Sequence, residues 1–368
     1  MTAGSDVKSL YGRLREHYTA DGIHALPQRK EVLQILELRY TPEEAELALS
    51  IPVIGQGRVS LEALVEKTGE KEAEVQNKLD SLLFKGVLYM ERKRDDGREV
   101  YCLWEFLYSM ATPLFGDGLV DDTKRKVTEL RDKMWDAGSS YLQYPSTHPY
   151  SRVMPYEPTL DPAVEVAPYE KYSHYVNNAR SICVVACGCR MSVDHCKLPV
   201  YVCIHFDRQA EYWIKYRRGR ELTKEEALEL IEDSVRKGLV VNGTNDQEMP
   251  LAFCLCCRDC CEILRPFIEN FNTNAFARSN FIPHWDLTKC NACNACQKAC
   301  PVGAIGRHLS HIEGERDHMI VMPDRCIGCG VCSAVCPQGA ITLKRVRDIV
   351  PLPTRKEVVG RHAVERVW

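Results

Sequence analysis

Two stretches of the sequence, KCNACNACQKACPVGAI (residues 289–305) and RCIGCGVCSAVCPQGAI (residues 325–341), share one pattern. Each reads C-x2-C-x2-C-x3-C-P, and the second copy begins 36 residues after the first. Three cysteines at this spacing can place three thiolates around one small metal centre, while the fourth cysteine and its proline lead away from it. Small residues such as Ala292, Gly328 and Gly330 allow the backbone to approach that centre closely. The repeat therefore predicts two metal centres in one duplicated domain.

This repeat resembles the bacterial two-cluster ferredoxin domain over about residues 281–343. The resemblance implies two [4Fe-4S] clusters that pass single electrons, without bond chemistry. It also implies that the fourth cysteine of each copy binds the cluster of the other copy. One cluster then has the ligands Cys290, Cys293, Cys296 and Cys336, and the other has Cys326, Cys329, Cys332 and Cys300. Zinc is the alternative, but zinc sites use paired C-x2-C knuckles and not triads with a remote fourth ligand.

A second group of candidate metal ligands precedes the repeat: Cys187, Cys189, Cys196, Cys203, Cys254, Cys256, Cys257, Cys260 and Cys261. Over about residues 152–368 the sequence resembles an iron–sulfur protein family of anaerobic bacteria. That resemblance is carried by the C-x-C-R motif at 187–190, a capped helix at 223–238, and the C-x-C-C motif at 254–257 ahead of a ferredoxin domain. Members of this family look like electron-wiring subunits of oxidoreductase complexes, which implies the same role for this chain.

Nine cysteines are enough for two further four-ligand centres. Adjacent side chains on an extended backbone point in opposite directions, so Cys256 and Cys257, like Cys260 and Cys261, suit two clusters better than one. We therefore expect two further [4Fe-4S] clusters in this middle region. Three alternatives stay open: one further cluster of unusual shape, a redox-active dithiol, or zinc bound with help from one of the two histidines His195 and His205.

Two other cysteines have a structural interpretation. Cys183 follows an apolar strand pattern, and Cys102 lies in a predicted hairpin strand, so both are expected to be buried thiols. Arg190 and Arg258 stand beside candidate ligands and would offset the negative charge of a cluster, or else simply form surface ion pairs.

The N-terminal part has the pattern of a small helical domain with a hairpin. Thr41-Pro42 predicts a capped helix start, and Ser60 caps a short helix over 61–67 that ends at Gly69. A longer helix over 70–85 follows, with Val75, Leu79, Leu82 and Leu83 on one face. Residues 87–93 and 99–104, joined by the turn 95–97, predict a β-hairpin. This order resembles a winged helix-turn-helix domain.

The predicted fold class is α+β and multidomain, with a winged-helix domain, a cysteine-rich iron–sulfur middle domain and a ferredoxin-like two-cluster domain. The expected boundaries are 1–140 for the winged helix and an added helix (chiefly 121–137), 141–177 for a segment rich in proline and tyrosine, 178–280 for the middle domain, 281–343 for the ferredoxin domain and 344–368 for a basic tail. The proline-rich segment is expected to be extended and to wrap over its neighbours. The long linker 306–324 inside the repeat predicts an exposed loop that contacts a partner.

Composition and charge narrow the class of protein. The 368 residues include 19 cysteines, an odd number, and a polar start without a signal-peptide core, so a disulfide framework is not expected. The 48 Lys and Arg residues are balanced by 51 Asp and Glu residues, which gives a net charge of -3. No run is apolar over the roughly 18 residues of a membrane span. These features predict a cytoplasmic protein.

The expected function is electron transfer to or from redox partner proteins, above all a catalytic oxidoreductase subunit. No catalytic or nucleotide-binding motif is present, so no catalytic residue is assigned. The alternatives are a redox-sensing iron–sulfur transcription regulator and a stand-alone iron–sulfur reductase. DNA is an unlikely partner because the helix over 70–85 carries more acidic than basic residues, and the hairpin at 91–99 is balanced in charge.

Overall fold

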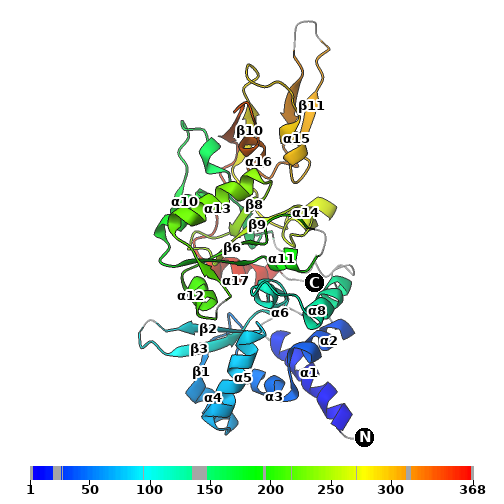
Figure 1. Ribbon diagram of the computed structural model, residues 1–368, viewed down its shortest axis with the longest axis vertical. Coiled ribbons are helices and arrows are strands. Elements are labelled where there is room, and N and C mark those ends of the chain that lie inside the picture. Colours follow the sequence, from blue (N-terminus) through cyan, green and yellow to red (C-terminus); the bar gives the residue numbers. More distant parts are fainter. Residues whose placement is uncertain are drawn as a thin grey trace. The chain divides into compact units, whose positions relative to one another are not determined.

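The computed structural model describes residues 3–19, 26, 28–93, 95–134, 147–193, 196–216, 218–270, 272–311 and 316–365. The chain forms two compact units, whose helices and strands are labelled in Figure 1. The first unit comprises Met1–Gln143, Val185–Asp194 and Glu211–Gly219, and the second comprises Tyr144–Val184, His195–Ala210 and Arg220–Trp368. No helix in the described part of the chain is both long enough and apolar enough to cross a membrane.

The first unit begins with the helices α1 (Ala3–Thr19), α2 (Lys30–Arg39) and α3 (Pro42–Ala48). The predicted cap of α3 is present, because Thr41 accepts a hydrogen bond from the Glu44 amide and the Glu44 carboxylate accepts one from the Thr41 amide. Buried tyrosines join these helices. The Tyr11 hydroxyl donates to the Tyr40 carbonyl, and the hydroxyls of Tyr18 and Tyr40 share a hydrogen bond.

The predicted helices and hairpin follow as β1 (Val59–Ser60), α4 (Leu61–Thr68), α5 (Glu72–Phe84), β2 (Leu88–Arg92) and β3 (Glu99–Leu103). Ser60 accepts the capping hydrogen bond from the Ala63 amide, and Gly69 ends α4 with a φ of 70°. The strands form an antiparallel sheet in the order β1-β3-β2. The four apolar residues predicted to share one face of α5 are all buried.

Three short helices and one longer helix complete the first unit: α6 (Phe106–Ser109), α7 (Thr112–Phe115), α8 (Asp122–Met134) and α11 (Gly188–Met191). The helix predicted over 121–137 corresponds to α8, and residues 135–137 lie outside the described residues. Helix α11 lies against α7 at a glycine. A Cβ atom on Gly188 would be 2.3 Å from the carbonyl carbon of Ala111, so no larger residue fits there.

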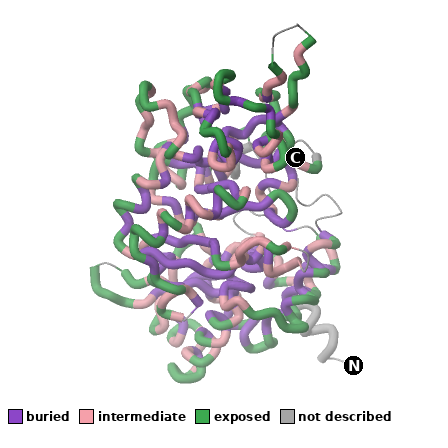
Figure 2. The backbone as a smooth tube through the Cα atoms, turned by 45° about the horizontal axis from the view of Figure 1, so that its top comes forward, coloured by how far each residue is buried: buried purple, intermediate pink, exposed green. Residues whose placement is uncertain are grey.

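A six-stranded sheet carries the middle region, in the order β4-β8-β9-β6-β5-β7. Its strands are β4 (Ser151–Val153), β5 (Ile182–Ala186), β6 (Tyr201–Phe206), β7 (Arg220–Glu221), β8 (Val240–Thr244) and β9 (Ala252–Cys256). Nearly every residue of β5, β6 and β8 is buried. Figure 2 colours the backbone by the burial of each residue. Helix α12 (Asp207–Lys215) follows β6, α13 (Lys224–Arg236) begins at the predicted capping box of Thr223, and α14 (Arg265–Asn270) follows β9.

Residues 147–171, here called the strap, are mostly irregular and extended. They contain β4 and two short 3-10 turns, Glu157–Thr159 and Pro168–Glu170. Helix α10 (Tyr172–Asn178) departs from the extended path predicted for 141–177. The last proline of the segment is Pro168, so the backbone donors beyond it are free to form a helix that buries Tyr172, Tyr175 and Val176. Residues 141–146 of the predicted segment lie outside the described residues.

The ferredoxin repeat forms two strand pairs and two short helices. Its elements are β10 (Phe281–Trp285), α15 (Ala295–Ala299), β11 (Ile305–His308), β12 (His318–Val321), α16 (Val331–Ala334) and β13 (Ile341–Arg345). Strand β10 pairs with β13, and β11 pairs with β12, both antiparallel. The linker predicted to be a loop is thus the β11–β12 hairpin, drawn at the top of Figure 1, and its residues 312–315 are not described.

The C-terminal tail returns to the middle sheet and ends in α17 (Arg355–Glu365). The Gln247 amide donates to the Leu352 carbonyl, and the guanidinium of Arg355 lies 3.4 Å from the buried carboxylate of Asp246. The excess of basic residues noted in the tail therefore includes one arginine that neutralises a buried acid of the same unit.

Candidate metal centres

The eight cysteines of the repeat lie around two separate hollows. The first hollow, here called site 1, is lined by Cys290, Cys293, Cys296 and Cys336, together with Trp285 and Met319. The second, site 2, is lined by Cys300, Cys326, Cys329 and Cys332. Each site thus contains three cysteines of one copy of the motif and the fourth cysteine of the other copy. These are the two ligand sets that the resemblance to ferredoxins implies.

Backbone conformation brings the cysteine loops close to these hollows. Ala292 and Asn294 have φ values of 53° and 63°, and Gly328 and Gly330 have 72° and 78°. A Cβ atom on Gly328 would lie 2.1 Å from the Ser279 hydroxyl oxygen and 2.2 Å from the Phe281 carbonyl oxygen. Only glycine fits at that position, both for its φ and for the space around it.

Burial disfavours the thiolate form of several of these cysteines when no metal is bound. It raises the pKa of Cys296 to about 11, and it also raises the pKa of Cys326, Cys329 and Cys332. Thiolates in these positions are therefore costly until metal ions supply the opposite charge, so binding of metal should release protons. The donor set, four thiols around each hollow with close backbone, fits a [4Fe-4S] cluster at each site.

The two sites differ in their exposure to solvent. Cys293 of site 1 is the one exposed cysteine among the eight. The strap is hydrogen-bonded to the segment that forms site 2: the Tyr156 amide donates to the Cys329 carbonyl over 3.1 Å, and Thr159 and Ser333 share a hydrogen bond of 2.6 Å between their hydroxyls. The Ser279 hydroxyl donates to the Gly328 carbonyl over 2.7 Å on the same loop. Site 1 therefore faces solvent at one ligand, and the loop of site 2 is held by the strap and by the residue before β10.

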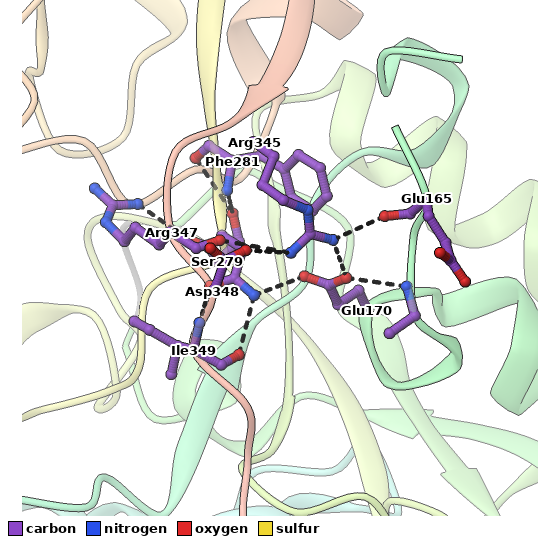
Figure 3. A network of polar contacts seen from close by, with 10 residues as sticks. Glu165, Glu170, Ser279, Phe281, Arg345, Arg347, Asp348 and Ile349 are labelled. Carbon is purple, nitrogen blue, oxygen red and sulfur yellow. Dashed lines mark hydrogen bonds and ion pairs between the residues drawn. The ribbon is translucent and has the colours of Figure 1, made fainter. Parts of the chain in front are cut away.

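A buried polar network fixes the strap to the repeat (Figure 3). The carboxylate of Glu170, 1% exposed, accepts hydrogen bonds from Arg345 and from the Asn280 side chain. Arg345 also donates to the backbone carbonyl of Glu165 over 3.1 Å. Asn280 exchanges two hydrogen bonds with the backbone of Ile349. The network joins the strap, β13 and the start of the tail around one ion pair.

Two arginines near site 2 were not singled out from the sequence. The positive charges of Arg347 and Arg278 act on Cys326 and partly offset the rise of its pKa that burial causes. Arg347 is oriented by a hydrogen bond of 2.8 Å to the Ser279 carbonyl. Of the two arginines that were singled out, Arg190 is buried and its charge acts on Cys187, while Arg258 is exposed and lies 3.7 Å from Asp259. No spacing pattern marks Arg278 or Arg347, because the fold brings them to site 2 from outside the motif.

The cysteines of the middle region fall into smaller sets. In the second unit, the Cys256 thiol has side-chain hydrogen bonds to Cys254 and Cys261, which together with burial raise its pKa. A different set contains Cys196, Cys257 and Cys260, whose Sγ atoms all lie within 4.8 Å of one another. The two members of each vicinal pair, 256–257 and 260–261, thus belong to different sets.

The other candidate ligands of this region also have polar neighbours. In the first unit, a hydrogen bond between Cys187 and Cys189, along with burial, raises the pKa of Cys187. In the second unit, the Sγ atom of Cys203 lies 3.5 Å from Nε2 of His205, whose pKa burial lowers to about 3. His195, the other histidine considered for zinc, lies outside the described residues.

The two cysteines interpreted as structural are fully buried. Cys102 and Cys183 are both 0% exposed, and burial raises the pKa of each thiol to about 12. Neutral thiols of this kind behave as small apolar side chains.

Comparison with known proteins bears on the repeat. Residues 289–340 match the family model of the 4Fe-4S dicluster domain. No curated protein matches the chain. The match agrees with the two four-cysteine hollows: this part of the chain is a ferredoxin-like domain with two [4Fe-4S] clusters, and the chain is an iron–sulfur protein. The resemblances to a winged helix and to a family of anaerobic bacteria stay predictions.

Proposed function

We propose that this chain is the electron-wiring subunit of an oxidoreductase complex of anaerobic metabolism. A [4Fe-4S] cluster takes up and releases one electron at a time, so two of them in one domain form a short conduit. The observation that carries the proposal is the pair of four-cysteine hollows, one with an exposed ligand and one whose loop is hydrogen-bonded to the strap. Among the described residues, nothing in these hollows suggests a group that would act on a substrate.

The two sites differ in exposure, which suggests that site 1 is the end of the conduit that exchanges electrons with a partner. At site 1, the exposed Cys293 offers the shortest path to a redox protein in solution. Three apolar side chains of the same domain, Leu287, Leu309 and Ile320, are 54%, 54% and 41% exposed and would suit a transient protein contact. At site 2, the strap holds the loop of Cys329, and Arg347 and Arg278 place positive charge near Cys326. We propose that electrons pass between a mobile redox partner and site 1.

We further propose that the N-terminal helices and hairpin form a winged-helix module that docks a protein. Each lysine of the α5 region, Lys71, Lys78 and Lys85, forms an ion pair with a glutamate. Arg92 and Arg98 of the hairpin are likewise paired with acidic neighbours, while Lys93 is exposed. Binding to phosphates requires basic groups that are not already neutralised, so this surface suits a protein partner better than DNA. Arg94 of the hairpin lies outside the described residues.

A redox-sensing transcription regulator is the alternative function. It is favoured by the element order of the first unit, in which α4, α5 and the β2–β3 hairpin have the sequence order of a winged helix. A stand-alone reductase, with its active site at the vicinal cysteines, is the other alternative that the sequence left open.

Isolation of the full chain from its native host under anaerobic conditions tests the proposal. We expect a stable complex with a flavin- or metal-dependent oxidoreductase, and we expect that the reduced chain passes electrons to it. The same preparation is titrated with random duplex DNA at low and moderate salt. Tight binding with a steep dependence on salt, without any oxidoreductase partner, would favour the regulator instead.

A further inference from the structure

Three cysteines of the second unit form an unusually compact group. The Sγ atoms of Cys196, Cys257 and Cys260 all lie within 4.8 Å of one another, and Cys257 and Cys260 are buried. Within the part of the chain that the structure describes, no other three histidine, cysteine or acidic side chains bring their ligand atoms this close together.

The cysteines of the dicluster domain supply an internal comparison. All eight are described, and no three of them are as compact as this group. The reason is geometric: on a cubane each cysteine binds a different iron at a different corner, so the sulfurs stay apart. Around a single ion the sulfurs share one centre, and thiolates about 2.3 Å from tetrahedral zinc lie about 3.8 Å from one another. The compact group therefore matches a mononuclear site.

The sheet explains why these residues meet. Strands β6 and β9 are antiparallel neighbours, with Ile204 opposite Phe253. The residues before β6 and those after β9 consequently lie at the same end of these two strands. Cys196 precedes β6, and Cys257 and Cys260 follow β9, so the pairing of two strands brings three thiols together across more than 60 residues of chain.

We propose that Cys196, Cys257 and Cys260 supply three ligands to one tetrahedral metal ion, and that this ion is zinc. Thiolates are ligands that zinc prefers, and a zinc ion bound mainly by cysteine can hold distant segments of a chain together. The ion cross-links the loops at this end of β6 and β9, and its binding releases the protons of the thiols. This site replaces one of the two clusters expected for the middle region. It is independent of the electron-transfer role, which rests on the dicluster domain.

The vicinal cysteines provide matched variants for the test. In Cys257→Ser, one member of the compact group is lost, while in Cys256→Ser the change falls one residue away, on the thiol that contacts Cys254 and Cys261. The full chain is purified anaerobically, and its zinc, iron and labile sulfide are measured. We expect one zinc per unaltered chain, a loss of at least tenfold in Cys257→Ser with iron and sulfide unchanged, and full retention of zinc in Cys256→Ser.

Zinc-edge X-ray absorption on the unaltered chain gives a second readout that does not depend on how well the variant folds. The proposal predicts a shell of sulfur at about 2.3 Å and no short metal–metal distance. Absence of zinc from the unaltered chain would overturn it. So would a Cys257→Ser variant that keeps its zinc, or one that loses iron and sulfide together, because a cluster would then occupy this group.

Discussion

The backbone amide of Tyr156 donates a hydrogen bond of 3.1 Å to the carbonyl of Cys329, so the strap contacts a cluster ligand directly. The side chain of Tyr156 also lies over the same loop: a Cβ atom on Gly330 would be 2.6 Å from the Cβ atom of Tyr156. The strap therefore packs against the loop that carries Cys329, and changes in the strap should affect site 2 more than site 1.

Crossed ligation makes a prediction about which cluster each fourth cysteine holds. Cys336→Ser should damage the cluster at site 1, because Cys336 lines that hollow with Cys290, Cys293 and Cys296. Cys300→Ser is the matched variant and should damage site 2. Electron paramagnetic resonance of the reduced, anaerobically purified proteins separates the two signals. If Cys336→Ser lost only the signal that Cys326→Ser also loses, the crossed assignment would be wrong.

Gly328→Ala should prevent proper assembly of site 2. The new Cβ atom would collide with Ser279 and Phe281, in addition to the cost of about 1–2 kcal/mol for alanine at positive φ. Gly339→Ala controls for that backbone cost, because Gly339 has a φ of 56° and open space around its Cβ position. We expect Gly328→Ala to lose about half of the iron that the dicluster domain binds, and Gly339→Ala to keep all of it. Equal iron content in both variants would show that site 2 assembles without the close contact of Gly328 with Ser279 and Phe281.

Glu170→Gln should destabilise the strap by about 3 kcal/mol, because it removes the buried carboxylate that Arg345 contacts and leaves only the exposed carboxylate of Asp348, 3.6 Å from the guanidinium. The control is Glu165→Gln, since Arg345 contacts only the backbone carbonyl of Glu165. The free energy of unfolding is measured by denaturant titration, together with the rate at which oxygen bleaches each cluster. We expect faster bleaching of site 2 in Glu170→Gln alone. If both variants had the same stability and the same rate of bleaching, the ion pair of Glu170 and Arg345 would not be what protects site 2.

Glu157 should make stability depend on pH in a defined direction. Burial raises the pKa of its carboxyl above the ordinary value of 4.5, although hydrogen bonds from Ser173 partly oppose this. Its contribution to stability is then complete below pH 4.5 and is lost as the pH rises through the folded-state pKa. In Glu157→Gln, the free energy of unfolding should depend less on pH above 4.5 than it does in the unaltered protein. Denaturant titrations of both proteins at several pH values above 4.5 check this. An equal dependence on pH in the two proteins would contradict it.

Much of the site could be predicted because its signal is local. The C-x2-C-x2-C-x3-C-P runs mark eight cysteines as candidate ligands, and the resemblance to ferredoxins implies how they divide between two clusters. The caps at Thr41, Ser60 and Thr223 lie where short-range hydrogen bonds place them. Side chains that alternate along extended backbone also account for the separation of Cys256 from Cys257.

What escaped prediction depends on contacts between distant segments. Cys196 meets Cys257 because β6 pairs with β9, and Arg347 reaches Cys326 because the tail runs beside β10. The partner of Glu170 lies 175 residues away in β13. Periodicity and capping signals extend over a few residues, so they carry no information on such pairings.

A reductive titration of the full chain tests whether the clusters of its dicluster domain carry single electrons. Anaerobically purified protein is titrated while its electron paramagnetic resonance is followed, and its iron and labile sulfide are counted. We expect at least about eight irons and eight sulfides per chain and two one-electron reductions that belong to the two sites. Protein that contains no labile sulfide, or that takes up no electrons at either site, would contradict it.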